Sequence, residues 1–392
     1  MFIAILSTIL LLLLLAEWYI YRCKIRGCSA RCRAIYYTLT ALATLPYILL
    51  WGVGKIWDLF SPITATISSV SIILLLINAV LKMCYAAGLW LGTTTKRRTP
   101  MVICNIVAIA IVGIILYGSL WERFQLRTTE VELHYKNLPE GADGLRIVQI
   151  GDLHIGLKPH RHKFLDKVVD QIVALNGDLV IDCGDMTSTR YAELDTTAMK
   201  ILSRVKAPLG VYTAMGNHDN GIYISDTLTL PRAENIRLLR ERQEAMGWRN
   251  ITDTTVVLGV GGDTLYLTAI DYPVQIKKGR HGVAIDDDYS SHFASLPREA
   301  FNIVIAHTPS VWDNILAACN AELTLSGHVH AMQLKFPFGK RGWSPSALVY
   351  DYWSGLYWND NCALHITDGV GSSMPIRVGV KPEIVVITLK KE

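Results

Sequence analysis

Several features that define common classes of binding protein and enzyme are absent from this sequence. Charged residues make up only 18% of its 392 residues, and the formal net charge is +4. No basic stripe is interleaved with aromatic residues, so we expect no nucleic-acid partner. The His-Glu-x-x-His segment of the zinc peptidases is missing, and so are internal repeats and low-complexity tracts.

Cysteine is too scattered along the chain to form a disulfide framework. Of the eight cysteines, three lie in a basic loop, at Cys23, Cys28 and Cys32. A zinc cluster in this loop would need a fourth ligand, and the loop offers none. We expect these residues to be reduced thiols or lipid attachment points beside a membrane.

Long apolar runs are concentrated before about residue 121. Four of them are near the roughly 20 residues that a helix needs to cross a bilayer: Phe2 to Tyr21, Ala34 to Val53, a run beginning at Ile63, and Met101 to Leu120. The first run lacks the small-residue cleavage pattern of a signal peptide, so we interpret it as an anchor. Residues 1–127 are therefore predicted to form a transmembrane region of about four spans, without paired charges that would indicate a channel.

Lysine and arginine in the short loops predict the orientation of this region. They are concentrated between Arg22 and Arg33 and between Lys96 and Arg98, whereas the second loop offers only Lys55 beside Asp58. The positive-inside rule places the two basic loops in the cytoplasm. With four spans, both termini and the domain over residues 128–392 lie outside.

The C-terminal domain shows alternating strand and helix patterns. Apolar runs at Leu145 to Ile150, Asp178 to Cys183 and Leu209 to Met215 are typical of buried strands, and helical periodicity follows each of the first two. This alternation predicts an α/β fold with parallel strands and a site at their carboxyl edge. Short strands after Thr254 predict a second, more antiparallel sheet packed on the first.

Five segments rich in metal-binding side chains each follow a predicted buried strand. They are Gly151-Asp152-Leu153-His154, Gly184-Asp185, Gly216-Asn217-His218-Asp219, Ala306-His307 and Gly327-His328-Val329-His330. Carboxylates and imidazoles gathered at one sheet edge can hold two divalent ions. Such a pair neutralises phosphate oxygens and lowers the pKa of a water molecule, which permits attack on a phosphate ester.

The order and residue types of these segments resemble the calcineurin-like metallophosphoesterase superfamily, and within it the membrane-anchored bacterial phosphodiesterase branch. The resemblance covers residues 128–392 and implies a four-layer αββα sandwich. Mixed nitrogen and oxygen ligands suit Mn, Fe, Zn or Ni, of which we favour Mn. By resemblance, Asp152, His154 and His330 hold one ion, Asn217, His307 and His328 hold the other, and Asp185 bridges them.

Further roles follow from the same resemblance. His218 matches the histidine that does not bind metal, stabilises the transition state and can protonate the leaving oxygen. Asp219 would hold the His218 ring by accepting its other N–H. Arg377, in a tail segment like that of the relatives, is a candidate partner for a phosphate or a structural carboxylate.

Some positions depart from the family pattern or lie beside the motifs. Ala331 and Met332 stand where relatives often carry two glycines, which narrows the floor beside His330. We expect His160 and His162 to be solvated loop residues rather than substrate contacts.

We predict a membrane-anchored, dinuclear metal-dependent phosphoesterase of a bacterial inner membrane, with its domain periplasmic or extracellular. Its substrate would be a phosphodiester or pyrophosphate of a lipid or envelope-linked molecule. One alternative resembles the UDP-2,3-diacylglucosamine pyrophosphohydrolases of lipid A synthesis, which need a cytoplasmic site. An alternative of another class is a catalytically silent metal-binding sensor or assembly module, and the intact His218 and ligand set argue against it.

Overall fold

The computed structural model describes residues 2–53, 62–157, 161–224, 230–272, 277–279, 282–284, 289–297, 299–339 and 342–392. The chain divides into two compact units, Met1–Glu122 and Arg123–Glu392. The division lies slightly before the boundary expected after residue 127. The predicted second loop of the membrane region, with Lys55 and Asp58, lies outside the described residues.

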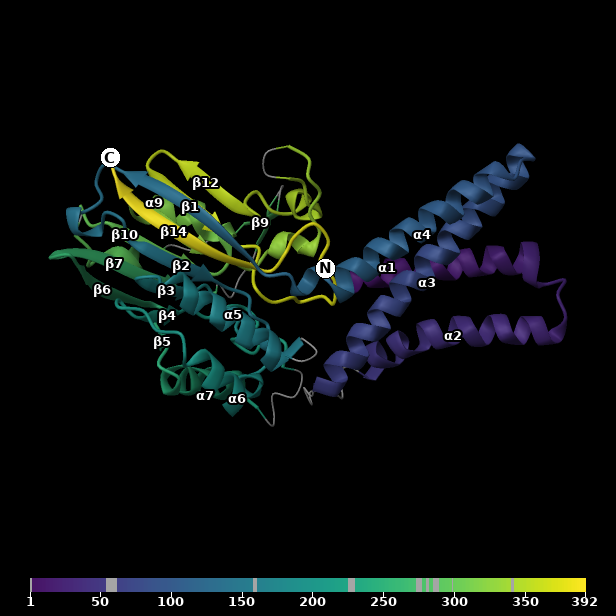
Figure 1. Cartoon of the computed structure of the whole chain (residues 1–392), viewed down its shortest axis with the longest axis horizontal. Helices are drawn as coiled ribbons and strands as arrows, with labels where there is room; N and C mark the ends of the chain where they lie inside the picture. Colours follow the sequence, from purple (N-terminus) through teal and green to yellow (C-terminus); the bar gives the residue numbers. More distant parts are fainter. Residues whose placement is uncertain are drawn as a thin grey trace. The chain divides into compact units, whose positions relative to one another are not determined.

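The N-terminal unit contains four helices, drawn in purple and blue in Figure 1: α1 (Phe2–Ile20), α2 (Ala30–Val53), α3 (Pro62–Thr95) and α4 (Thr99–Leu120). Three described segments are long and apolar enough to cross a membrane: Leu6–Ile25, Thr66–Thr95 and Thr99–Phe124. Helix α2, which contains Arg31, Arg33 and Pro46, is not among the segments found within the described residues. The four predicted helices are thus present, and three described segments meet the requirement for a span.

A polar cluster joins α1, α2 and α3 inside this unit. The Glu17 carboxylate lies 3.0 Å from the Lys82 ammonium, and these side chains are only 13% and 18% exposed. Thr40 donates to Glu17 at 3.1 Å, and the Tyr36 hydroxyl also donates to this carboxylate. The expectation of no paired charges is therefore wrong, because sequence spacing does not show which helix faces meet. Pairing offsets the high cost of placing each charge in hydrocarbon.

The first of the two large sheets of the C-terminal unit has six strands, with β14 inserted between β1 and β2. Strand β14 is parallel to β1 and antiparallel to β2, whereas β2 to β5 are mutually parallel, as predicted. The order is β1 (Arg127–Tyr135), β14 (Glu383–Lys391), β2 (Arg146–Ile150), β3 (Leu179–Asp182), β4 (Val211–Thr213) and β5 (Arg249–Asn250).

The second sheet is more parallel than predicted. Its central strands β7, β10, β11 and β13 run parallel, and only the edge strands β6 and β12 are antiparallel to their neighbours. The order is β12 (Gly355–Asn359), β13 (Cys362–Ile366), β11 (Leu323–Ser326), β10 (Asn302–Ala306), β7 (Asp263–Ile270) and β6 (Thr254–Val260). The expectation of a more antiparallel sheet is corrected here: β10 and β11 are buried along their whole length, as parallel strands covered on both faces are.

The two sheets pack face to face across one apolar core. Leu133, Ile147 and Ile181 from the first sheet meet Leu267 and Ile305 from the second. Helices α5 (Arg161–Leu175), α6 (Thr196–Leu202) and α7 (Arg232–Ala245) lie along the first sheet (Figure 1), and α5 and α6 share a second apolar cluster with β2, β3 and β14. Helices α8 (Ser290–Phe293) and α9 (Trp312–Ala318) pack against β7 and β10 of the second sheet. The predicted αββα sandwich is confirmed.

Short elements complete the described part of the fold. Strands β8 (Lys277–Gly279) and β9 (Gly282–Ala284) pair separately. Single turns of 3-10 helix lie at Glu122–Phe124, Glu140–Ala142, Ile155–Leu157, Tyr191–Glu193, Pro309–Val311, His330–Gln333 and Pro345–Leu348, and a π-helical turn at Tyr21–Ile25.

Candidate active site

The strand ends deliver every predicted ligand to one edge of the sandwich. Asp152 and His154 follow β2, Asp185 follows β3, and Asn217 follows β4. Backbone hydrogen bonds tie these segments together: the Asp152 amide donates to the Gly184 carbonyl at 2.7 Å, and the His154 amide to the Asp185 carbonyl at 3.0 Å. From the second sheet, the Gly327 amide donates to the His307 carbonyl at 3.0 Å, which links the segments after β10 and β11. The site therefore lies where the two sheets meet.

Several ligand candidates have a left-handed backbone that side chains rarely adopt. The φ angles are 54° at Asp152, 43° at His154, 57° at Asp185, 73° at His328 and 51° at His330. Strain of this kind is concentrated at functional sites, because the surrounding structure must hold it in place.

Two motif glycines are required by close contact with the carboxylates. A Cβ atom at Gly216 would lie 2.1 Å from Asp185 Oδ1, and one at Gly327 would lie 2.5 Å from Asp152 Oδ2. Gly216 and Gly327 thus each make room for a carboxylate delivered by another strand.

The ligand atoms form three overlapping groups within the described residues. Each group has one ligand atom per residue, all within 4.8 Å of one another: Asp152, His154 and His330; His154, Asp185 and His218; and Asp185, His307 and His328. Asp185 belongs to two groups, as expected of a bridging carboxylate. The arrangement can accommodate two neighbouring cations.

The chemistry of the donor atoms fits a cation. His154 Nε2 and His330 Nε2 lie 3.2 Å apart. Burial lowers the pKa of His154 to about 3, so this imidazole is neutral and its lone pair is available. Burial also lowers the pKa of His307, but the Asp185 carboxylate outweighs this and raises it to about 10, so positive charge is favoured beside Asp185. Burial raises the pKa of Asp152 to about 7, because it destabilises the charged carboxylate. A neighbouring cation would stabilise this carboxylate.

Hydrogen bonds orient the second set of ligands. His307 donates Nδ1–H to the Cys183 carbonyl at 2.9 Å, which directs its Nε2 into the site. Asn217 Oδ1 lies 3.2 Å from His307 Nε2 and 2.8 Å from His328 Nδ1. Tyr223 accepts a hydrogen bond of 3.0 Å from Asn217 Nδ2, which turns the amide oxygen toward the ligands.

Tyr223 is a site residue that the sequence analysis missed. Its ring also packs on His218, with ring centroids 4.3 Å apart and planes at 31°. No motif marks this position, and the only available signal was the need of the Asn217 amide for a hydrogen-bond partner. One phenol thus positions both a metal-ligand candidate and the candidate acid.

We expect Tyr223→Phe to weaken metal retention at the Asn217 side and lower kcat by about 10- to 100-fold, as loss of an outer hydrogen-bond partner does. The ring contact with His218 would remain. Tyr352→Phe is the matched control, since the Tyr352 hydroxyl donates to Asp313 outside the candidate metal groups. Metal content and kcat together measure the effect, and an unchanged kcat in Tyr223→Phe would remove this residue from the site.

The structure corrects the role predicted for Asp219. His218 Nδ1 lies 2.6 Å from the Ser188 carbonyl, so this carbonyl orients the ring. Asp219 is fully buried and accepts hydrogen bonds from the Thr187 amide and hydroxyl, at 2.8 and 2.9 Å, and from the Gly216 amide at 3.1 Å. Asp219 therefore ties the segments after β3 and β4 together and does not hold the His218 ring.

Arg377 is also corrected, because it is fully buried and bonded to the backbone. Its guanidinium donates to the carbonyls of Asp368 and Gly369, at 2.9 and 3.0 Å, and to Ser372 Oγ at 3.2 Å. These bonds fix the loop whose Gly369 lies against Asp152 and His330. Arg377 therefore supports the floor of the site through its bonds to backbone carbonyls.

Arg377→Met should lower the free energy of unfolding by about 2 to 4 kcal/mol, because several buried carbonyls lose their donor. Thermal unfolding of the detergent-solubilised protein measures this, with Arg204→Met as the control, since Arg204 forms only surface ion pairs among the described residues. A raised KM with unchanged stability would instead restore Arg377 as a substrate contact.

The remaining positions singled out in the sequence lie at or beyond the margins of the site. Ala331 and Met332 both have a φ of 47°. This backbone conformation favours glycine, so the backbone at both residues is strained. His162 lies in the first turn of α5 and not in a loop as expected, and it pairs with Asp195 at 3.0 Å, outside the candidate metal groups. His160 lies outside the described residues.

Comparison with known proteins gives a consistent result. Residues 145–332 match the calcineurin-like phosphoesterase family. The chain is 29% identical over 294 residues to the zebrafish (Danio rerio) transmembrane protein with metallophosphoesterase domain, covering 73% of this chain and 63% of that protein, which is less than two thirds of its length. It is 26% identical over 283 residues to the uncharacterized metallophosphoesterase YkuE of Bacillus subtilis, covering 70% and 89%. It is 24% identical over 223 residues to the UDP-2,3-diacylglucosamine pyrophosphatase LpxG of Chlamydia muridarum, covering 50% and 67%.

Proposed function

We propose that this chain, whose residues 145–332 match the calcineurin-like phosphoesterase family, is a membrane-anchored, dinuclear metal-dependent hydrolase that cleaves a phosphodiester or pyrophosphate. The observation that carries the proposal is the set of three overlapping ligand groups that share Asp185 and His154. Asp152, His154 and His330 would hold one ion, and Asn217, His307 and His328 the other. Mn is the ion we favour from a donor set that also suits Fe, Zn or Ni.

The protein side chains have separable tasks in this reaction. Two bound divalent ions would supply charge that neutralises the phosphate oxygens and makes a water molecule more acidic. His218 would give a proton from Nε2 to the leaving oxygen, while its Nδ1–H remains bonded to the Ser188 carbonyl. Tyr223 packs on the His218 ring, which limits the positions available to the acid.

A lipid or envelope-linked substrate is supported by two features. The N-terminal unit has three described segments able to cross a membrane. Only six residues, Trp121 to Leu126, connect α4 to β1, and even fully extended they reach at most about 22 Å. A tethered site meets substrates confined to the membrane plane at raised effective concentration. One relative is named a UDP-2,3-diacylglucosamine pyrophosphatase, which makes this substrate class the second candidate.

A comparison of two protein forms tests the substrate. Full-length protein and a chain beginning at Glu122 would be assayed on lipid phosphodiesters in vesicles and on a soluble ester. The shorter form must keep Phe124, because its ring lies 6.1 Å from that of Phe164 on α5. We expect the full-length protein to favour the vesicle substrate. Equal relative rates for both forms on both substrates would mean that the anchor serves retention only.

The orientation follows from the number of spans. With four spans, both termini lie outside a bacterial inner membrane and the hydrolase domain is periplasmic or extracellular. With three, the termini lie on opposite sides. A single cysteine would be placed at either terminus and labelled in intact cells from the outside. Four spans predict that both termini are labelled. A labelled N-terminus with a protected C-terminal domain would contradict four spans and favour the cytoplasmic pyrophosphatase.

A further inference from the structure

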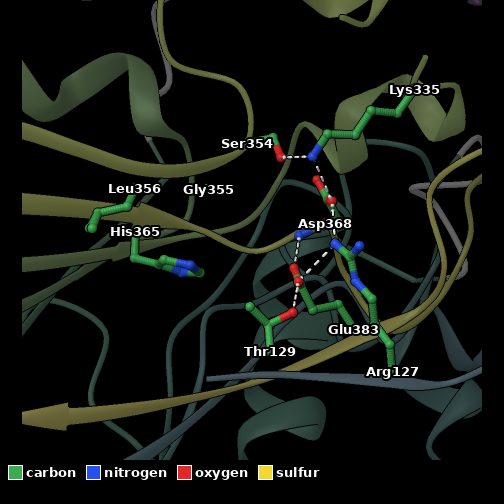
Figure 2. A pocket seen from close by; sticks show the side chains of 9 residues that line it. All are labelled: Arg127, Thr129, Lys335, Ser354, Gly355, Leu356, His365, Asp368 and Glu383. Atoms are coloured by element: carbon green, nitrogen blue, oxygen red, sulfur yellow. Dashed lines mark hydrogen bonds and ion pairs between the residues drawn. The ribbon is translucent and has the colours of Figure 1, made fainter. Parts of the chain in front are cut away.

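A second pocket lies beside the candidate metal site, between the start of β1 and β14 and the end of β13. It has a volume of about 500 Å³, within the range of roughly 300 to 1,000 Å³ that ligand pockets occupy. Figure 2 shows that its lining is largely polar, with Arg127, Lys335, Asp368, Glu383 and His365 among the labelled side chains. None of these residues belongs to the candidate metal groups.

The charges of this pocket cancel. Arg127 lies 2.8 Å from Asp368 and 2.8 Å from Glu383, and Lys335 lies 3.3 Å from Asp368. The carboxylates are buried, with 1% and 5% of their side chains exposed, whereas Lys335 is 17% and Arg127 35% exposed. Two cations thus balance two carboxylates, and a neutral ligand suits this balance better than an ion does.

The pocket also offers hydrogen-bond donors. Among the described residues, the Lys335 ammonium donates to Ser354 Oγ at 2.8 Å and to Asp368 Oδ2, which uses two of its three N–H donors. Arg127 Nε is buried without a partner in the described structure. The third N–H of Lys335 can therefore donate to a ligand oxygen, and Arg127 supplies a second unpartnered N–H in the same lining.

Two acceptors belong to residues that line this pocket. Asp368 Oδ1 is buried and has no hydrogen-bond partner among the described residues. The Gln149 amide nitrogen donates to the Ser326 and His365 carbonyls, which fixes the orientation of the amide group. The Gln149 Oε1 atom then lies 2.7 Å from His365 Nδ1 and accepts its N–H. His365 is buried, which lowers its pKa and keeps the ring neutral, so its Nε2 carries a lone pair.

We propose that this pocket binds the hydroxylated ring of a sugar. A hydroxyl group can both donate and accept a hydrogen bond at one oxygen atom. Its hydrogen would meet the acceptors Asp368 Oδ1 and His365 Nε2. Its oxygen would accept from Lys335 and Arg127. A phosphate dianion offers no donor for the two acceptors. A metal cation would be repelled by the Lys335 ammonium and the Arg127 guanidinium, which already pair with both carboxylates.

The pocket shares a loop with the candidate active site. Asp368 is followed by Gly369, where a Cβ atom would lie 2.9 Å from Asp152 Cβ and 2.8 Å from His330 Nδ1. A ring bound at Asp368 would therefore lie one residue from the floor of the site. It would be either the sugar of a substrate headgroup, which rests on the proposed function, or a separate sugar.

Saturation-transfer NMR with methyl β-D-glucopyranoside tests the pocket. The full-length protein would be kept in lauryldimethylamine oxide, which has neither a sugar nor a phosphate headgroup. We expect transfer to the ring protons in the wild type, and an apparent affinity weaker by at least about fivefold in both Lys335→Met and Asp368→Asn, because each removes a hydrogen bond. Lys390→Met is the matched control, since Lys390 pairs at the surface with Asp143 at 3.9 Å.

The results separate the possibilities. Absence of transfer in the wild type, or equal affinity in both variants and the control, would overturn the proposal. So would variant-sensitive binding of inorganic phosphate without binding of the glucoside. If Asp368→Asn fails to fold, as judged by thermal unfolding, Lys335→Met decides.

Kinetics then identify the source of the sugar. A loss in Lys335→Met of kcat/KM for UDP-glucose, but not for bis(4-nitrophenyl) phosphate, would place the ring in the substrate. Equal rates would indicate a separate sugar. Because the NMR experiment needs no turnover, failure of the proposed activity would not be mistaken for failure of the pocket.

Discussion

Asp185→Asn should remove more metal and more activity than any other single ligand substitution. Asp185 contributes to two of the three ligand groups, and one of its oxygens lies 3.2 Å from His307 and 3.8 Å from His154. An asparagine keeps the shape but lacks the negative charge and the second oxygen that two cations share. We expect the loss of kcat to exceed the about 100-fold that removal of an outer hydrogen-bond partner costs.

Asp182→Asn is the matched control for this change. Asp182 is a buried carboxyl group three residues upstream, and burial together with the Asp219 charge raises its pKa well above the usual value. Both effects favour the neutral carboxyl group, which an amide resembles. Metal analysis that finds two tightly held ions in Asp185→Asn would contradict the bridging role.

His218→Ala should keep both metals and lower kcat by about 100- to 10,000-fold, the range for a positioned general acid. The ring lies beside the ligands, with its centroid 4.7 Å from that of His154, and its orientation is fixed by the Ser188 carbonyl. Substrates with a good leaving group need less protonation, so we expect a smaller loss with bis(4-nitrophenyl) phosphate than with an alkyl ester. Full activity on both esters in a metal-replete variant would exclude His218 from catalysis.

The ligand positions could be predicted because each follows an apolar strand that is visible in the sequence. Buried runs such as Leu179–Asp182 end at polar residues, and parallel strands bring those ends to one edge. The parallel direction of the central strands of the second sheet was not predicted, because short apolar runs do not record strand direction.

Side-chain pairing between distant segments could not be predicted from sequence. Asp219 follows His218 directly, which made it the obvious partner for the ring, yet the backbone turns its carboxylate toward Thr187. Arg377 has the chemistry of a phosphate ligand, but its burial against backbone carbonyls is a tertiary property. The Glu17–Lys82 pair depends on the faces that two helices present to each other.

The central claim is hydrolysis of phosphate esters that depends on two bound metal ions. The most direct measurement is the rate of bis(4-nitrophenyl) phosphate hydrolysis by purified full-length protein with known metal content, before and after treatment with a chelator and after addition of Mn. We predict two ions per chain, loss of activity with the chelator and recovery with Mn. A metal-replete protein without activity, or a rate that the chelator does not change, would contradict the account.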